Sequence, residues 1–114
     1  MSDCLFCKIR EGQIPAKVIH RDEHCLAFED INPQAPMHVL VIPNKHIATV
    51  NDIGPADREA VGHLFIAAAK LAKDRGYDQS GYRVVMNTQQ AAGQTVFHIH
   101  LHVLAGRALH WPPG

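Results

Sequence analysis

The sequence has no excess of charge of either sign, no long apolar run and few aromatic residues. Its 114 residues include 11 basic and 11 acidic side chains, and aromatic residues make up only 6%. A balanced chain lacks the charged surface that binds duplex nucleic acid or an anionic membrane, so we expect neither partner. No apolar stretch is long enough to span a bilayer, and no basic segment followed by an apolar run forms a secretory signal. These absences predict a cytoplasmic protein with a small, locally held ligand.

Cysteine is scarce and odd in number, at three residues. Without an export signal, the spacing Cys4-x-x-Cys7 indicates metal or redox chemistry before a disulfide framework. A structural zinc site needs two further ligands, for which His46 and His98 are candidates. The alternative is two packed thiols without a metal. Cys25 falls inside a predicted strand and is expected to be a small buried apolar residue.

Histidine is abundant, at nine residues, and three of them share one stretch. Between Gly93 and Gly106, His98, His100 and His102 alternate with aliphatic residues, which predicts a half-buried strand with three imidazoles on one face. His100 is the candidate nucleophile or general base, and His102 could contact a phosphate oxygen. A purely structural role for the three is the alternative.

Polar groups that could hold an anion precede this strand. Gly93, Gln94 and Thr95 would let backbone amides approach a phosphate closely. Asn87, at the end of the preceding predicted strand, offers a side-chain amide to the same anion, although asparagine is also an ordinary turn former.

The pattern of the whole chain predicts one α+β domain over residues 1–114, with a five-stranded antiparallel sheet, one main helix and a short N-terminal helix. The expected elements are a helical turn at 4–11, strands at 17–21, 24–30, 38–43, 82–87 and 93–106, and a helix from Pro55 to Gly76. Apolar residues recur every three or four positions along the main helix: Ala60, Val61, Leu64, Phe65, Ala68, Leu71 and Ala72.

The tail holds the single tryptophan, Trp111, followed by two prolines and a glycine. Two prolines exclude a helix there. The indole is expected either to pack against the domain or to dock on a neighbouring molecule.

The His-x-His-x-His stretch resembles the signature of the histidine-triad (HIT) superfamily. The resemblance extends over nearly the whole chain, including Ile14–Lys17, Leu26–Ile31, Pro33–Pro36, His38–Pro43 and the ending His110-Trp111-Pro112-Pro113-Gly114. That ending is particular to the Hint branch, the purine nucleoside phosphoramidases. The resemblance implies a HIT-like homodimer whose two sheets join into one, with residues 107–114 as a tail at or near the interface.

In function, the resemblance implies hydrolysis of the P–N bond of AMP or GMP amidates through a nucleotidyl-histidine intermediate. His100 matches the nucleophile, and His102 matches a second catalytic histidine that contacts the phosphate. Trp111 is expected to lie near the active site of the neighbouring subunit. The residues expected to bind the purine nucleoside monophosphate are Asn87, Gln94, Thr95, Val96, Asp30, Ile31, Phe28, Leu5, Phe6, Ile9 and His38.

The resemblance also implies a structural zinc ion held by Cys4, Cys7, His46 and His98. Three other interpretations of the sequence stay open. The chain could be a dinucleoside polyphosphate hydrolase, or a nucleotide-binding regulatory protein that acts through other proteins. The three strand histidines could instead bind a catalytic metal together.

Overall fold

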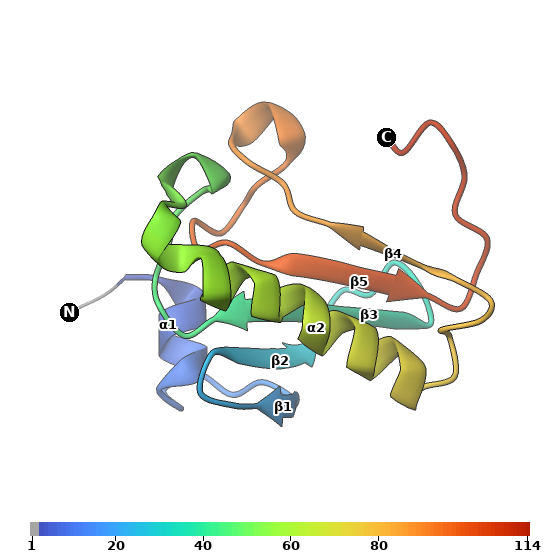
Figure 1. Ribbon diagram of the computed structural model, residues 1–114, viewed down its shortest axis with the longest axis horizontal. Coiled ribbons are helices and arrows are strands. Elements are labelled where there is room, and N and C mark those ends of the chain that lie inside the picture. The colour runs from blue at the N-terminus through green and yellow to red at the C-terminus, as the bar shows by residue number, and fades with distance from the viewer. Residues whose placement is uncertain (1–2) are drawn as a thin grey trace.

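The computed structural model describes residues 3–114, in which five antiparallel strands form one sheet and a long helix crosses one of its faces (Figure 1). The elements are α1 (Leu5–Arg10), β1 (Val18–Arg21), β2 (Cys25–Glu29), β3 (Met37–Pro43), α2 (Arg58–Asp74), β4 (Tyr82–Val85) and β5 (Leu101–Ala105). The strand order is β1-β2-β3-β5-β4. The predicted α+β class is confirmed, while the first two residues of the predicted domain lie outside the described residues.

The strands at the centre of the sheet are the most apolar. All seven residues of β3 are buried, as its unbroken run of aliphatic residues predicts for a strand covered on both faces. β3 pairs with β2 and β5. The strands predicted at 17–21 and 24–30 are also confirmed, and they form a hairpin: β1 pairs with β2 across a turn in which Asp22 Oδ1 accepts hydrogen bonds from the His24 and Cys25 amides.

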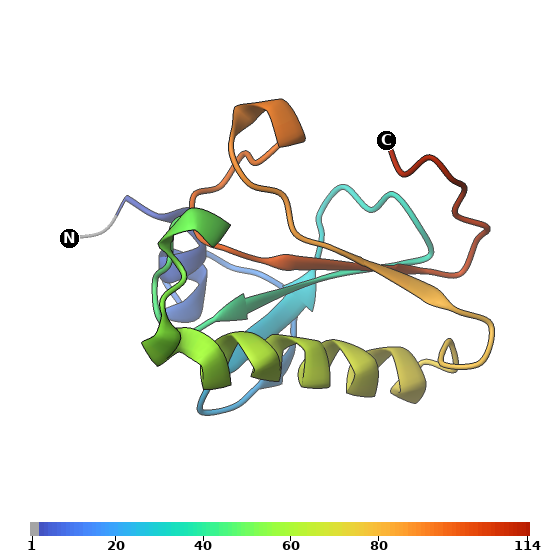
Figure 2. The same cartoon turned by 45° about the horizontal axis from the view of Figure 1, so that its top comes forward.

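Helix α2 follows a 3-10 turn at Pro55–Asp57 and ends before Gly76, whose φ of +84° lies in the left-handed region that glycine adopts readily. Turning the view shows that the helix lies along one side of the sheet (Figure 2). Its buried residues form the stripe Leu64, Ala67, Ala68, Leu71 and Ala72. No helix within residues 3–114 has the length and apolar character needed to cross a membrane.

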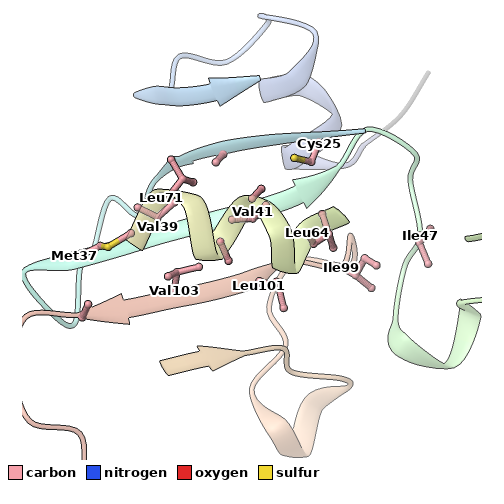
Figure 3. Close-up of a cluster of buried hydrophobic side chains, with 14 residues drawn as sticks. Cys25, Met37, Val39, Val41, Ile47, Leu64, Leu71, Ile99, Leu101 and Val103 are labelled. Carbon is pink, nitrogen blue, oxygen red and sulfur yellow. The ribbon is translucent and has the colours of Figure 1, made fainter. Parts of the chain in front are cut away.

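The main core lies between α2 and the sheet, where Leu64 and Leu71 meet Val39, Val41 and Val103 (Figure 3). The prediction that Phe65 belongs to this face is wrong, because its side chain is 51% exposed. Residues 64 and 65 are 100° apart around the helix axis, so a stripe centred on the first turns the second toward solvent.

The other face of the sheet carries a smaller core under α1. Phe6 and Ile9 of this short helix pack with Leu26, Phe28 and Leu40. Six residues are too few to form a stable helix alone, so α1 depends on this packing. α1 therefore sits on the face opposite α2.

The predicted strand over Gly93–Gly106 is shorter than expected, because sheet pairing begins only at Leu101. The backbone before it turns toward another partner, since the Ile99 amide donates to the Ile47 carbonyl at 2.7 Å, outside the sheet. β4 likewise ends at Val85, two residues before the predicted end. The aliphatic residues that alternate with the histidines are buried as predicted: Ile99, Leu101 and Val103 all lie in the main core.

Candidate functional site

His100 lies just before β5 with its ring buried and its tautomer fixed. Its Nδ1 is 2.8 Å from the His98 carbonyl oxygen, which can only accept, so Nδ1 carries the proton and Nε2 keeps its lone pair. Burial lowers the pKa of His100, and this effect outweighs the hydrogen bond to His98 and the charge of Asp30, which both raise it. A neutral imidazole with an unprotonated Nε2 is a competent nucleophile near neutral pH.

His102 belongs to a chain of hydrogen bonds that begins at the backbone amide of Gln34. That amide donates to His38 Nδ1 at 3.0 Å, so the proton of His38 must reside on Nε2. His38 Nε2 lies 2.9 Å from His102 Nδ1 and 3.4 Å from Asp30 Oδ2. His102 Nδ1 therefore accepts, and its own proton resides on Nε2 as a hydrogen-bond donor.

Burial, followed by the neighbouring His100 and His38 rings, lowers the pKa of His102 to about 4. Burial also lowers the pKa of His38, against the opposing charge of Asp30. Both rings are thus neutral at pH 7. The ring centroids of His100 and His102 lie 5.0 Å apart, so the Nε2 lone pair of His100 and the Nε2–H donor of His102 belong to neighbouring rings.

An apolar pocket of about 150 Å³ opens beside these rings, between α1 and β2. A dry cavity of roughly this volume is enough to hold a benzene ring. Phe6 lines the pocket and touches His100 edge to face, with ring centroids 4.9 Å apart. Six of the residues predicted to bind the nucleoside monophosphate line it: Leu5, Phe6, Ile9, Phe28, Asp30 and Ile31.

The predicted phosphate-binding residues take different positions around the rings. Thr95 and Val96 line a second, more open hollow, and Leu5 lines both hollows. Gln94 is buried, and its side-chain amide bonds the backbone of Gln89, Ala48 and Val96, so its polar atoms serve to hold the loop.

Asn87 lies two residues beyond β4 and is half-buried. The β4–β5 ladder ends at the pair of Val85 with His102, so Asn87 follows the strand that flanks His102.

The four predicted metal ligands are brought together, with their ligand atoms all within 4.8 Å of one another: Cys4, Cys7, His46 and His98. His98 Nδ1 lies 3.3 Å from Cys4 Sγ and 3.5 Å from Cys7 Sγ. Tetrahedral zinc with bonds of about 2.3 Å to sulfur and 2.0 Å to nitrogen sets such atoms roughly 3.5 Å apart. The donor set therefore fits a closed zinc site.

Further contacts of His46 and His98 support the same tetrahedral geometry. His46 Nδ1 lies 3.4 Å from Cys7 Sγ. His98 Nε2 donates to the Pro43 carbonyl at 2.9 Å, which leaves its Nδ1 lone pair on the side of the two sulfurs. Burial lowers the pKa of His98 to about 4, so the ring is neutral as a ligand must be.

The three histidines do not share one cluster of metal-ligand atoms. Within residues 3–114, His98 groups with the cysteines, and His102 groups with Asp30 and His38, while His100 belongs to neither group. The sequence had already suggested this division, with His98 as a zinc ligand, His100 as the nucleophile and His102 as a phosphate contact. It could not supply the backbone carbonyls that fix the rings, that of Pro43 for His98 and that of His98 for His100, because they carry no side-chain signal.

Sequence reasoning missed several residues of the apolar pocket: Ile14, Pro15, Ala16 and Leu40. The first three belong to a segment between α1 and β1 without periodicity, so no pattern marks them. Trp111 is 82% exposed, which shows that the indole does not pack against its own domain.

Comparison with known proteins identifies the family of the chain. Residues 11–109 match the HIT domain family. A HIT family hydrolase from Legionella pneumophila is 54% identical, with a TM-score of 0.96 over 98% of this chain and 100% of that one. A purine nucleoside phosphoramidase of Escherichia coli K12 is 45% identical, and the match covers 94% of this chain and 90% of the relative. An uncharacterized HIT-like protein of Synechocystis is 46% identical, over 98% of this chain and 97% of the relative. The chain belongs to the HIT family, and its relatives agree with the Hint branch.

Proposed function

We propose that the protein is a purine nucleoside phosphoramidase, which hydrolyses the P–N bond of nucleoside monophosphate amidates. The observation that carries the proposal is the buried, neutral His100, whose Nδ1 is held by the His98 carbonyl so that Nε2 can attack phosphorus. The E. coli relative named for this activity supports the choice of bond.

In the first step, the Nε2 lone pair of His100 forms a bond to phosphorus while the P–N bond of the substrate breaks. The departing nitrogen takes up a proton and leaves as an amine, because an amine anion is a very poor leaving group. Water then attacks the phosphorus of the nucleotidyl-histidine and gives up a proton, which balances the proton taken up by the amine. The bond to Nε2 breaks, and the nucleoside monophosphate is released. His100 returns to its starting form.

The developing charge on phosphate needs donors that are already in place. The Nε2–H of His102 is one, because His38 occupies its other ring nitrogen. Asn87, Thr95 and the Val96 amide are proposed as further donors. Thr95 and Val96 line the more open hollow, and all three residues are half-buried or exposed.

The nucleoside is proposed to occupy the apolar pocket, with the purine against Phe6 and Phe28. Asp30 lines the same pocket, and its carboxylate is suited to accept from two ribose hydroxyls. Oδ1 already accepts from the Asn32 amide at 2.8 Å, which holds the carboxylate in place.

The test is turnover of an adenosine phosphoramidate by His100→Ala. We expect kcat to fall by at least about 10³-fold, in the range seen when a catalytic nucleophile is removed, while AMP binding changes little. His24→Ala is the matched control, because His24 lies at the β1–β2 turn with its Nε2 near Glu23 and Glu59. Unchanged turnover in His100→Ala would refute the assignment, and faster cleavage of diadenosine polyphosphates than of the amidate would favour the polyphosphate hydrolases.

Zinc at Cys4, Cys7, His46 and His98 is proposed as a structural ion. Bound there, zinc would supply cross-linking between α1, the loop after β3 and the segment leading into β5. It would act on the chemistry only by fixing the backbone at His98, whose carbonyl holds His100.

A homodimer is also proposed. β1 and β4 are the edges of the sheet within residues 3–114, and the tail contacts β4 through the Arg83 guanidinium, which donates to the His110 carbonyl at 2.8 Å. Joining two sheets edge to edge through β4 would bring the exposed Trp111 of each subunit toward the other. Sedimentation should then show a single species of twice the chain mass.

A further inference from the structure

A second cluster of metal-ligand atoms lies where the β1–β2 turn meets α2, apart from the proposed catalytic and zinc sites. His20 comes from β1, Asp22 from the turn and Cys25 from the start of β2. One ligand atom from each of the three lies within 4.8 Å of the other two. Neither the proposed hydrolysis nor the proposed structural zinc uses any of them.

The spacing of these atoms approaches that of a tetrahedral metal site. Cys25 Sγ lies 3.6 Å and His20 Nε2 lies 2.7 Å from Asp22 Oδ2. Around zinc, with bonds of about 2.3 Å to sulfur and 2.0–2.1 Å to nitrogen and oxygen, the corresponding separations are roughly 3.6 and 3.3 Å. The sulfur–oxygen separation therefore already matches that of a zinc site, and the imidazole must withdraw from the carboxylate by about half an ångström.

The carboxylate is held in position by groups outside this trio. His63 of α2 donates from Nε2 to Asp22 Oδ2 at 2.8 Å, and the His24 and Cys25 amides donate to Oδ1. Hydrogen bonds of this kind to a ligating carboxylate orient it and strengthen metal binding. Burial alone would raise the pKa of Asp22, but the hydrogen bonds from His63, His20 and the two amides hold it well below its usual range.

Access and burial are also suitable for an ion. The side chains of His20 and Asp22 are 22% and 26% exposed, whereas Cys25 is fully buried beneath them. An ion arriving from solvent would meet the partly exposed imidazole and carboxylate first, and the buried sulfur would complete the three protein ligands.

We propose that His20, Asp22 and Cys25 form a second binding site for a divalent transition-metal ion such as zinc, with His63 orienting the carboxylate. On binding, the Cys25 thiol loses its proton to solvent as the metal–sulfur bond forms. The His20 proton moves from Nε2 to Nδ1 so that Nε2 can ligate. The ion then ties β1 to β2 and, through His63, to α2.

Cobalt(II) provides a selective test, because a thiolate ligand gives it an intense charge-transfer absorption. The chain has three cysteines, so in the variant Cys4→Ser/Cys7→Ser the single remaining thiol is that of Cys25. We expect this variant to bind one cobalt ion per chain with the thiolate absorption. Adding Cys25→Ala should abolish the absorption, and adding the exposed His110→Ala should leave it unchanged. No thiolate absorption in the Cys4→Ser/Cys7→Ser variant, once circular dichroism shows it folded, would overturn the site.

If that variant does not fold, zinc content decides in the otherwise natural chain. Cys25→Ala and His20→Ala should each retain one zinc fewer per chain than the natural protein after dialysis. His63→Ala should weaken zinc binding at this site by roughly 10–100-fold, as expected for a group that orients a ligand. Equal zinc content in the natural chain and in Cys25→Ala would overturn the proposal. Since every readout is metal binding, these results do not depend on the proposed phosphoramidase activity.

Discussion

At the scale of single residues, the three histidines of the 98–102 stretch differ in which ring nitrogen keeps its lone pair. His98 donates from Nε2 to the Pro43 carbonyl, so its Nδ1 is the available ligand atom. His100 donates from Nδ1, so its Nε2 is the available nucleophile. His102 accepts at Nδ1 from His38, so its Nε2–H is a donor. One hydrogen-bond partner per ring therefore makes three chemically identical side chains suited to three different roles, as metal ligand, nucleophile and hydrogen-bond donor.

The lowered pKa of His100 predicts the acid limb of the pH profile. Because burial favours the neutral ring, Nε2 stays unprotonated at pH values where an ordinary histidine, with a pKa near 6.5, is half protonated. We expect the acid limb of kcat/KM for an adenosine phosphoramidate to be centred below pH 6.5. The measurement is kcat/KM between pH 4.5 and 8 at constant ionic strength. A limb centred above pH 6.5 would contradict the assigned electrostatics.

At the scale of elements, α2 is held to the sheet by its buried stripe. Leu64 is fully buried in the core between helix and sheet, so Leu64→Ala removes apolar contact and leaves a cavity. We expect a loss of about 2–5 kcal/mol in the free energy of unfolding. Lys73→Ala, at an exposed position in the last turn of the same helix, should change it by less than about 0.5 kcal/mol. Urea unfolding of both variants measures the difference, and equal losses would contradict the burial pattern.

The elements show what the sequence can and cannot predict. The hairpin, the buried β3 strand, α2 and the aliphatic row through Ile99 and Leu101 follow from local periodicity and turn residues. The exposure of Phe65 does not follow from the sequence, because an apolar residue at this position fits several possible buried stripes of the helix and only the tertiary packing selects one. The start of β5 cannot be predicted from local sequence either, because the hydrogen bond between the Ile99 amide and the Ile47 carbonyl joins segments far apart in the chain.

The proposed structural zinc predicts how α1 responds to chelation. The helix has six residues and carries Cys4 as its N-terminal cap and Cys7 within it, so removing the ion frees the end nearest His98. In zinc-loaded protein we expect chelation to lower Tm by roughly 10 °C, since an ion at 100 times its dissociation constant contributes about 2.7 kcal/mol. Amide hydrogen exchange should quicken in α1 and leave α2 unchanged. Exchange that quickens in α2 and not in α1 would place the ion elsewhere.

At the scale of the whole molecule, the sheet places its histidines unevenly between its two faces. The aliphatic row before and within β5 faces α2, while His98 and His100 face α1, where each ring meets Phe6 edge on. The site is thus built into the smaller core, and its imidazoles are buried as part of the folded structure. Folding and the neutral state of these rings are consequently linked.

That linkage predicts a loss of stability in mild acid. Burial lowers the pKa of His98 and of His102 from 6.5 to about 4, so between these values the unfolded chain binds protons that the folded chain does not. Stability is therefore complete above pH 6.5 and falls as pH decreases toward 4, by at most about 1.4 kcal/mol per pH unit for each histidine. The lowered pKa of Asp22 adds a loss only below its ordinary value of 3.8, so it does not contribute to this window. The measurement is urea unfolding of metal-free protein from pH 7.5 to 4, with His102→Gln expected to give a shallower slope. A free energy of unfolding that stays constant over this range would show that these rings are protonated without cost in the folded state.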